Sequence, residues 1–330
     1  MKLLHLGKKG NVEKYTVADD FTQNIELVDL PVATPVKEIL EAASDADFMF
    51  VDAMGAVPAE LIDAMPNLKL IQSEGVGFQF FALDAAATRG VYVCNGRGIN
   101  AVAVAEQAVM LMIGVLRDVI GGDRAVREGR QISVKENYMA SGDLKELADL
   151  TVGLYGFGAI AKALARILKA MGVRVQYYNR TRASLETEAE YGVVYLPLDE
   201  LVASSDMISI HVPLNAETKK IVDDKFFARM KPGSYIINTA RGEIIDSAAL
   251  VRALKSGKIA KAGLDTLADE PVRLDNILIN LPGDLAGRLL FSPHIGGITA
   301  SSFKRAYDIA WKNVRLVARG ARPENIVNGL

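Results

Sequence analysis

The sequence Val152-Gly-Leu-Tyr-Gly-Phe-Gly-Ala-Ile-Ala161 is an apolar run that enters a glycine-rich turn, and a helical pattern, 159–171, follows it. This is the G-x-G-x-x-G/A arrangement: Gly156 permits a tight turn, Gly158 lets backbone amides approach a pyrophosphate, and Ala161 keeps the helix close to the strand. The helix start adds free N–H groups and partial positive charge. We therefore expect a bound dinucleotide rather than an empty turn. The residues expected to hold it are Gly156, Phe157, Gly158, Ala159 and Ile160.

The next predicted strand, 173–178, ends in Tyr178-Asn-Arg-Thr-Arg182. NAD-binding sites of this kind carry an acid about 20 residues past the glycines, but the residue 23 positions after Gly156 is an asparagine. Arginines can pair bidentately with a 2′-phosphate, which an acid would repel. We expect Asn179, Arg180, Thr181 and Arg182 to favour NADP, with NAD possible. A solvated basic loop is the alternative.

Short apolar runs alternate with helical patterns along most of the chain. Alternation of this kind predicts parallel sheets covered by helices on both faces, so the expected fold class is α/β. The expected strands are 3–6, 25–30, 48–51, 69–72, 91–94, 152–155, 173–178, 207–212, 234–238 and 260–264, and the expected helices are 36–43, 59–64, 100–117, 159–171 and 300–319. Gly121-Gly122 is expected just past the helix that Asn100 caps, and 121–150 is expected to be a connection.

Composition limits the classes of function. A chain of 330 residues with half of them apolar suggests two domains, and a net charge of −2 gives no reason to expect a nucleic-acid partner. The most apolar long stretch, 101–116, is interrupted by Glu106 and Gln107 and is too short for a membrane span. The single cysteine, Cys94, lies in an apolar run and is interpreted as core packing. We expect a cytoplasmic protein without membrane association.

Several short segments of the chain, taken in their order along the sequence, resemble the motifs of a known enzyme family. They are Gly75-Val-Gly77, Ala103-Val-Ala-Glu106, His211-Val-Pro-Leu214 with Glu217-Thr218, Asn238-Thr-Ala-Arg-Gly242, Asp265-Thr-Leu-Ala-Asp-Glu-Pro271 and Ser292-Pro-His-Ile-Gly-Gly297. Together they resemble the D-2-hydroxyacid dehydrogenase family, in particular its glyoxylate and hydroxypyruvate reductases, from about residue 69 to 330. The resemblance implies hydride transfer between NADP(H), or NAD(H), and a small 2-oxo acid or D-2-hydroxy acid.

The resemblance also implies catalytic roles. Arg241 would bind the substrate carboxylate and carbonyl oxygen, His294 would be the general acid/base, and Glu270 would accept a hydrogen bond from His294. The chemistry is consistent, because a histidine is poised near neutral pH and a neighbouring carboxylate favours its protonated form. Arg241 follows the apolar run 235–237, at a strand end where α/β proteins bind ligands. Taken singly, Arg241 could be an ion-pairing surface residue and His294 a packing residue.

The remaining implied roles concern binding. The backbone amides of Val76 and Gly77, with Gly75, would hold the substrate carboxylate, and Asp265 would contact the nicotinamide carboxamide. Ala53 and Met54, after the strand 48–51, are expected to line the substrate pocket, and His5 is expected to be structural. The other residues expected beside the cofactor are His211, Val212, Pro213, Thr218, Thr239, Ala240, Gly296 and Gly297.

The sequence departs from the family at the substrate end. Glu74 replaces a neutral residue, Gln79-Phe80-Phe81 replaces an Asp-containing stretch, Arg97 stands where a small residue or proline is common, and 272–290 is longer than usual. These differences leave the identity of the 2-oxo acid open, with glyoxylate, hydroxypyruvate and other 2-ketoacids as candidates.

Other chemistries fit less well. No tyrosine is followed by a lysine four places on, and one cysteine with three scattered histidines gives no zinc spacing, so no metal is expected. Formate oxidation needs no acid/base pair such as Glu270 and His294. A nucleotide-sensing corepressor with little turnover is the alternative from a different class, because it could retain the same residues.

We thus expect a Rossmann NAD(P)-binding domain, 100–297, inserted into a flavodoxin-like substrate domain, 1–99 and 298–330. The catalytic cleft is expected between the two domains, with closure excluding water. The resemblance implies a homodimer, with the helix 100–117 at or near its interface.

Overall fold

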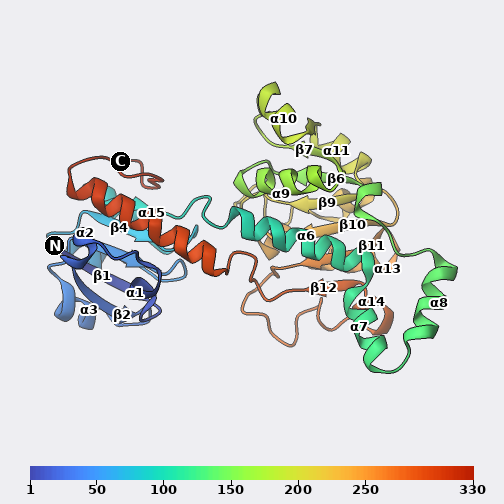
Figure 1. The fold of residues 1–330 in the computed structure, drawn as a ribbon, viewed down its shortest axis with the longest axis horizontal. Coiled ribbons are helices and arrows are strands. Elements are labelled where there is room, and N and C mark those ends of the chain that lie inside the picture. The colour runs from blue at the N-terminus through green and yellow to red at the C-terminus, as the bar shows by residue number, and fades with distance from the viewer. The chain divides into compact units, whose positions relative to one another are not determined.

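The computed structural model describes residues 1–330 and divides into two compact units, Met1–Asn100 with Ile298–Leu330, and Ala101–Gly297 (Figure 1). Each unit has one sheet in which every pair of neighbouring strands is parallel. The predicted fold class, two doubly wound α/β units with one inserted into the other, is confirmed. No helix is both long enough and apolar enough to cross a membrane.

The first unit is a five-stranded sheet in the order β2-β1-β3-β4-β5, which is the flavodoxin-like order. Its strands are β1 (Lys2–Gly7), β2 (Glu26–Pro31), β3 (Phe48–Val51), β4 (Leu70–Ser73) and β5 (Tyr92–Cys94). Its helices are α1 (Asn11–Tyr15), α2 (Asp20–Gln23), α3 (Val36–Ala43), α4 (Ala59–Asp63), α5 (Leu83–Thr88) and α15 (Ala300–Ala318).

Alternating side chains of this sheet fill two separate cores. Leu4 and Met49 pack on the side of α3 and α4, whereas Phe48 and Phe50 pack on the side of α15, against Tyr307 and Trp311. Both faces are therefore buried, as expected for parallel strands that read as continuous apolar runs. Cys94 belongs to the second of these cores, and burial raises the pKa of its thiol to about 12, in keeping with a packing role.

The second unit is a seven-stranded sheet in the order β12-β11-β10-β9-β6-β7-β8. Counted from β6, this is the Rossmann order with one additional strand at the β11 edge. Its strands are β6 (Thr151–Tyr155), β7 (Arg174–Tyr178), β8 (Val193–Tyr195), β9 (Met207–Ile210), β10 (Ser234–Asn238), β11 (Ile259–Leu264) and β12 (Leu289–Phe291). Its helices are α6 (Ala101–Arg117), α7 (Val119–Arg127), α8 (Gln131–Ser141), α9 (Ala159–Ala170), α10 (Leu185–Tyr191), α11 (Leu198–Ser204), α12 (Asp224–Arg229), α13 (Ser247–Lys255) and α14 (Gly283–Ala286).

The two faces of this sheet are covered by different helices. Leu154 and Tyr177 pack with α6 and α9, whereas Ile210 and Leu264 pack with α11, α12 and α13. The carboxyl ends of the parallel strands lie at one edge of the sheet, and the loops that leave them carry all the site residues predicted in this unit.

The segment after α6 was predicted wrongly. Residues 121–150 were expected to be a connection, but α7 and α8 occupy much of it, and Gly121 and Gly122 lie inside α7. Asp118 separates α6 from α7 because its backbone is left-handed, and its carboxylate accepts hydrogen bonds from Tyr138 and from Lys261, the latter at 3.0 Å. The turn thus depends on Asp118 rather than on the glycines. The short strands β8 and β12 were also not predicted.

Candidate active site

The glycine turn has the geometry that a pyrophosphate needs. Gly156 has a φ of +100°, and a side-chain carbon there would lie 2.7 Å from the carbonyl oxygen of His211, so only glycine fits. A side-chain carbon on Gly158 would point into open space. Helix α9 begins at Ala159 without any side chain capping its first N–H groups. These donors are therefore available to an anion.

The loop after β7 lies beside this turn. The backbone N–H of Gly156 donates to the Tyr178 carbonyl at 2.9 Å, and that of Phe157 lies 3.4 Å from the side-chain oxygen of Asn179. The two arginines of the loop have different surroundings. Arg182 makes two hydrogen bonds of 2.8 Å to Glu188, whereas Arg180 is 3.5 Å from Glu217, with both side chains largely exposed. Arg180 is therefore the less firmly held of the two guanidiniums, because its single contact is long and exposed.

His211 lies on the opposite side of the glycine turn. Its Nε2 is 2.8 Å from the Ser209 hydroxyl, and burial lowers its pKa to about 4, so the ring is neutral at pH 7. The loop that follows is closed by Thr218, whose hydroxyl donates to the carbonyl of Pro213 at 2.6 Å. The predicted cofactor residues of this loop are thus positioned next to the glycine turn by local hydrogen bonds.

Arg241 leaves the carboxyl end of β10. Buried Asn238 fixes the loop, because its side chain accepts from the Ala240 N–H at 3.0 Å and donates to the Arg241 carbonyl at 2.9 Å. A side-chain carbon on Gly242 would lie 1.9 Å from the backbone carbon of Leu267, so the loop packs directly on the segment that follows β11. The guanidinium of Arg241 is exposed and contacts only its neighbouring carbonyl, that of Ala240, at 2.7 Å.

Asp265, at the end of β11, organises the histidine segment. Its carboxylate accepts hydrogen bonds from the N–H groups of Ile295 and Gly296, at 3.1 and 2.9 Å, and from the Ser292 hydroxyl. Its backbone carbonyl accepts from the His294 N–H at 2.9 Å. Gln107 of α6 reaches the same cluster and donates to Ser292 at 2.8 Å. Sequence reasoning missed Gln107 here, and its only signal was a polar residue inside an apolar helix.

The His294 imidazole and the Glu270 carboxylate form the central contact of the site. The Nδ1–H of His294 donates to Oε2 of Glu270 at 2.5 Å, and the other carboxylate oxygen accepts from the Leu267 N–H at 3.0 Å. His294 has a φ of +54°, a backbone conformation that non-glycine residues rarely adopt outside constrained sites. Both side chains are partly exposed, so Nε2 of His294 is accessible to a ligand.

The same edge fits a nicotinamide dinucleotide in one further respect. The hydroxyl of Thr239 is buried and has no hydrogen-bond partner in the protein. Buried polar atoms are rarely left unpaired, so this hydroxyl suits a ligand that supplies a polar atom. Together with the open N–H groups at the start of α9, it makes the residues present compatible with the cofactor that the glycine motif predicts.

The predicted carboxylate loop of the first unit follows β4. Its backbone is tied down by the Ser73 hydroxyl, which donates to the Gly77 carbonyl at 2.6 Å, and by the Asn95 side chain, which donates to the Val76 carbonyl at 2.8 Å. A side-chain carbon on Gly75 would lie 2.7 Å from the methyl group of Ala53. The loops after β3 and β4 are therefore in direct contact at the carboxyl edge of the first sheet.

Comparison with known proteins identifies the family. The model of the D-isomer specific 2-hydroxyacid dehydrogenase NAD-binding domain matches residues 109–296, which is more than half of the chain. A glyoxylate reductase of Thermococcus litoralis is 35% identical over 305 residues, which cover 92% of this chain and 90% of that protein. This chain belongs to the D-isomer specific 2-hydroxyacid dehydrogenase family. It is an oxidoreductase that acts on CH–OH donors with an NAD(P)-binding domain.

Solved structures of this family share the fold over nearly the whole chain. The apo form of Rhodotorula graminis D-mandelate dehydrogenase has a TM-score of 0.84 and 30% identity, and covers 99% of this chain and 97% of its own. A glyoxylate reductase from Paecilomyes thermophila has a TM-score of 0.80 and 30% identity, with coverage of 99% and 98%. The predicted family and fold are thus confirmed.

The first unit contains a cluster of buried polar side chains next to the loop after β4. Nε2 of fully buried His5 lies 3.0 Å from the Glu74 carboxylate, and its Nδ1 lies 2.6 Å from the Asp29 carboxylate. The Tyr307 hydroxyl of α15 donates to Glu74. Burial acts to lower the pKa of His5, but the two carboxylates outweigh it, and the net shift is upward. Burial also raises the pKa of Tyr307, so the phenol remains a donor.

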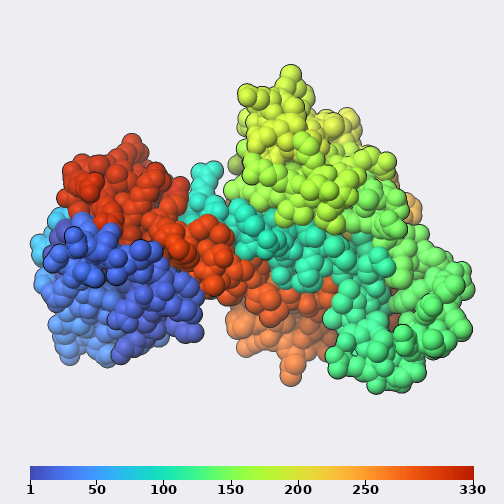
Figure 2. Space-filling view, in the orientation of Figure 1, coloured from blue at the N-terminus to red at the C-terminus, as the bar shows by residue number.

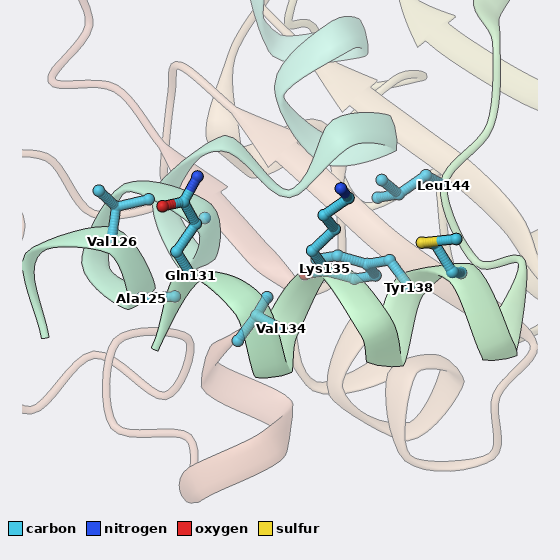
Figure 3. A pocket seen from close by; sticks show the side chains of 9 residues that line it. Ala125, Val126, Gln131, Val134, Lys135, Tyr138 and Leu144 are labelled. Carbon is cyan, nitrogen blue, oxygen red and sulfur yellow. The ribbon is translucent and has the colours of Figure 1, made fainter. Parts of the chain in front are cut away.

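A cavity of about 360 Å³ lies outside the predicted site. It is formed by α7, α8 and the residues after them (Figure 3), and its lining residues include Val126, Val134, Tyr138 and Leu144. None of its lining residues was predicted to bind substrate or cofactor. Figure 2 shows the chain around α7 and α8 at the surface of the second unit.

Proposed function

We propose that this dehydrogenase reduces a small 2-oxo acid to the D-2-hydroxy acid with NADPH as the preferred reductant. The observation that carries the proposal is the 2.5 Å contact between His294 and Glu270, at the strand edge that also carries Arg241. A carboxylate-backed imidazole and an exposed guanidinium at the same strand edge are what protonation and polarisation of a ketone require. The first unit is the substrate domain in this proposal, and the second is the nucleotide domain.

The roles of the side chains follow from their contacts. A bound NADPH would supply the hydride to the carbonyl carbon. Arg241 binds the substrate carboxylate and polarises the carbonyl oxygen. Protonated His294 then gives its Nε2 proton to that oxygen, which yields the alcohol and a neutral imidazole. Glu270 holds the ring through Nδ1, so that Nε2 faces the substrate.

The binding roles rest on the local geometry described above. The amides of Val76 and Gly77, with Gly75, contact the substrate carboxylate, and Ala53 and Met54 line its pocket. The pyrophosphate of NADPH would bind at residues 156–160. Residues 211–213, Thr218, Thr239, Ala240, Gly296 and Gly297 surround the remainder of the cofactor. Asp265 contacts the carboxamide in addition to organising the histidine segment.

The preference for NADP over NAD is assigned to the loop after β7. It has no acid at position 179, and Arg180 makes only a long, exposed contact with Glu217, while Arg182 makes two short hydrogen bonds to Glu188. The test is kcat/KM with NADPH and NADH for the native enzyme and for Arg180→Ala. We expect NADPH to be preferred and the variant to lose most of that preference. A native enzyme that strongly prefers NADH would refute the assignment.

The substrate is tested with a panel of 2-oxo acids. Glyoxylate and hydroxypyruvate are included because curated relatives are glyoxylate reductases, and benzoylformate because a structural relative is a D-mandelate dehydrogenase. Consumption of NADPH with formation of the D-hydroxy acid would support the proposal. Tight binding of NADPH without turnover of any 2-oxo acid would refute it and would indicate a nucleotide-sensing binding protein instead.

We also propose that the enzyme is a homodimer through helices α6, α7 and α8. These helices expose eight large apolar side chains, an unusual concentration for a free surface. They are Val102, Met110, Ile113, Val119, Ile120, Val126, Ile132 and Met139. Sedimentation velocity of the native protein should give twice the mass of one chain, and Met139→Asp should shift the mass toward one chain. A native protein that sediments as a monomer at micromolar concentration would refute the dimer.

A further inference from the structure

The carboxyl edge of the first sheet exposes an apolar rim. We define the rim as Met54, Val76 and Phe80, with 73%, 38% and 51% of their surface exposed. Only seven large apolar residues of the first unit are exposed, and these three, with Val32, all lie on loops that leave strands at this one edge. The other three, Met1, Val17 and Ile298, lie elsewhere. Apolar surface concentrated beside the loop assigned to the substrate carboxylate favours the binding of an apolar group.

The loops that carry the rim form a built surface. The Val57 N–H donates to the carbonyl of Phe80 at 3.1 Å, and the Ala82 N–H donates to the carbonyl of Val57 at 2.9 Å, which joins the loop after β3 to the loop after β4. Ala53 packs on Gly75, as described above. The Met54 N–H donates to the Asp52 carboxylate at 2.9 Å, so this acid is turned toward its own backbone. Backbone contacts thus hold the rim, while its side chains remain uncovered.

Charges flank the rim on the neighbouring strands. Lys8 and Lys9 are exposed after β1, and Arg97 is exposed after β5; none of the three forms an ion pair. The Gly96 N–H donates to the Gly75 carbonyl at 2.6 Å, so Arg97 is carried on a segment bonded to the carboxylate loop. Uncompensated positive charge favours the approach of an anion. The edge therefore combines attraction for one carboxylate with an apolar surface next to it.

The carbonyl carbon of a 2-oxo acid carries one group besides its oxygen and the carboxylate. We propose that the rim binds this group, and that the preferred substrates are 2-oxo monocarboxylates in which it is branched aliphatic or aromatic. This inference rests on the proposed function, because Val76 belongs to the loop assigned to the substrate carboxylate. It differs from the activity named for the glyoxylate reductase relatives, whose named substrate has only hydrogen at that position. Each CH₂ buried on the rim contributes a factor of about four to binding.

The test is kcat/KM with saturating NADPH for glyoxylate, pyruvate, 4-methyl-2-oxopentanoate, phenylpyruvate and oxaloacetate. We expect kcat/KM for the branched or the aromatic substrate to exceed that for glyoxylate by at least about tenfold, which corresponds to just under two buried CH₂ groups. Met54→Ala and Phe80→Ala should each reduce the ratio of kcat/KM for this substrate to kcat/KM for glyoxylate by about tenfold. Val17→Ala removes an exposed apolar side chain elsewhere in the unit and serves as the matched control, with the ratio unchanged.

The outcomes separate the two proposals. Turnover with none of the five acids would refute the proposed function itself. Turnover in which glyoxylate is best would leave that function standing and refute the rim. A preference for oxaloacetate that disappears in Arg97→Ala would also refute the rim, since the substituent would then be anionic. If the rim variants alter the sedimenting mass rather than the selectivity, the rim is a contact between copies of the chain, and the proposal fails.

Discussion

The two strand edges to which we assign the chemistry and the substrate selectivity are built in different ways. At the edge of β10, β11 and β12, buried Asn238 and Asp265 fix the loops through hydrogen bonds, and His294 is locked to Glu270 before any ligand binds. At the edge of β3 and β4, hydrogen bonds from buried Ser73 and Asn95 and backbone contacts between the loops also fix the backbone, but the side chains of Met54 and Phe80 contact solvent. The difference lies in the side chains: in our proposal the side chains for the chemistry are already held by hydrogen bonds, whereas those for selectivity are covered only when the substrate binds. Changes at the first edge should therefore alter kcat for every substrate, and changes at the second should alter selectivity.

The largest expected effect is that of His294→Gln. The amide retains some hydrogen bonding but cannot deliver a proton, so kcat should fall by about 10²–10⁴ with every 2-oxo acid. Binding of NADPH, followed by nucleotide fluorescence, should be nearly unchanged. A kcat within threefold of the native value would remove His294 from the mechanism and would erase the proposed distinction between the two edges.

A smaller loss of rate is expected for Glu270→Gln. The amide keeps the size of the side chain but no longer offers a charge to the imidazolium, so kcat should fall by about 10–100-fold, because a charged hydrogen bond becomes a neutral one. The ratios of kcat/KM between different 2-oxo acids should remain the same. Single-turnover oxidation of NADPH measures the step directly. Selectivity that changes along with kcat would contradict the separation of roles.

The contact between Glu270 and His294, and the place of Arg241 at a strand end, could be predicted from sequence because the three residues lie in short segments whose order is distinctive. The supporting contacts could not be predicted in this way. Gln107 and Asp265 are 158 residues apart, and the pairing of Arg182 with Glu188 depends on where α10 begins. Helices α7 and α8 were not predicted because the pair Gly121-Gly122 is typical of a helix end. In the structure α6 ends at the left-handed backbone of Asp118, and the two glycines lie inside α7.

The buried cluster under the substrate loop should affect binding rather than chemistry. Tyr307→Phe removes one donor from the buried Glu74 carboxylate and should lower the free energy of unfolding by about 1–3 kcal/mol. The KM for the 2-oxo acid should rise a few-fold, and kcat should stay within twofold. Tyr15→Phe is the control, because the Tyr15 ring stacks on Tyr307. An unchanged KM, with stability reduced, would limit the cluster to a structural role.

The smallest expected effect concerns pH and His211. Its pKa is about 4 in the folded protein and about 6.5 when unfolded, so the unfolded chain binds the additional proton between these values. Stability from the neutral ring is fully present above pH 6.5 and is lost as the pH falls toward 4. Urea unfolding of the cofactor-free protein at several pH values measures this loss. The free energy of unfolding should fall less steeply with decreasing pH in His211→Asn than in the native protein. The same dependence of unfolding free energy on pH in both proteins would contradict the assignment of a neutral His211 ring.

The most direct test of the central claim is a crystal structure of the enzyme with NADP and oxamate, an unreactive analogue of a 2-oxo acid. We predict that Nε2 of His294 and the guanidinium of Arg241 both lie within hydrogen-bond distance, about 2.6–3.2 Å, of the analogue's carbonyl oxygen. Oxamate bound away from both side chains, or with its carbonyl oxygen bonded to neither, would contradict the assignment of these residues to the reaction.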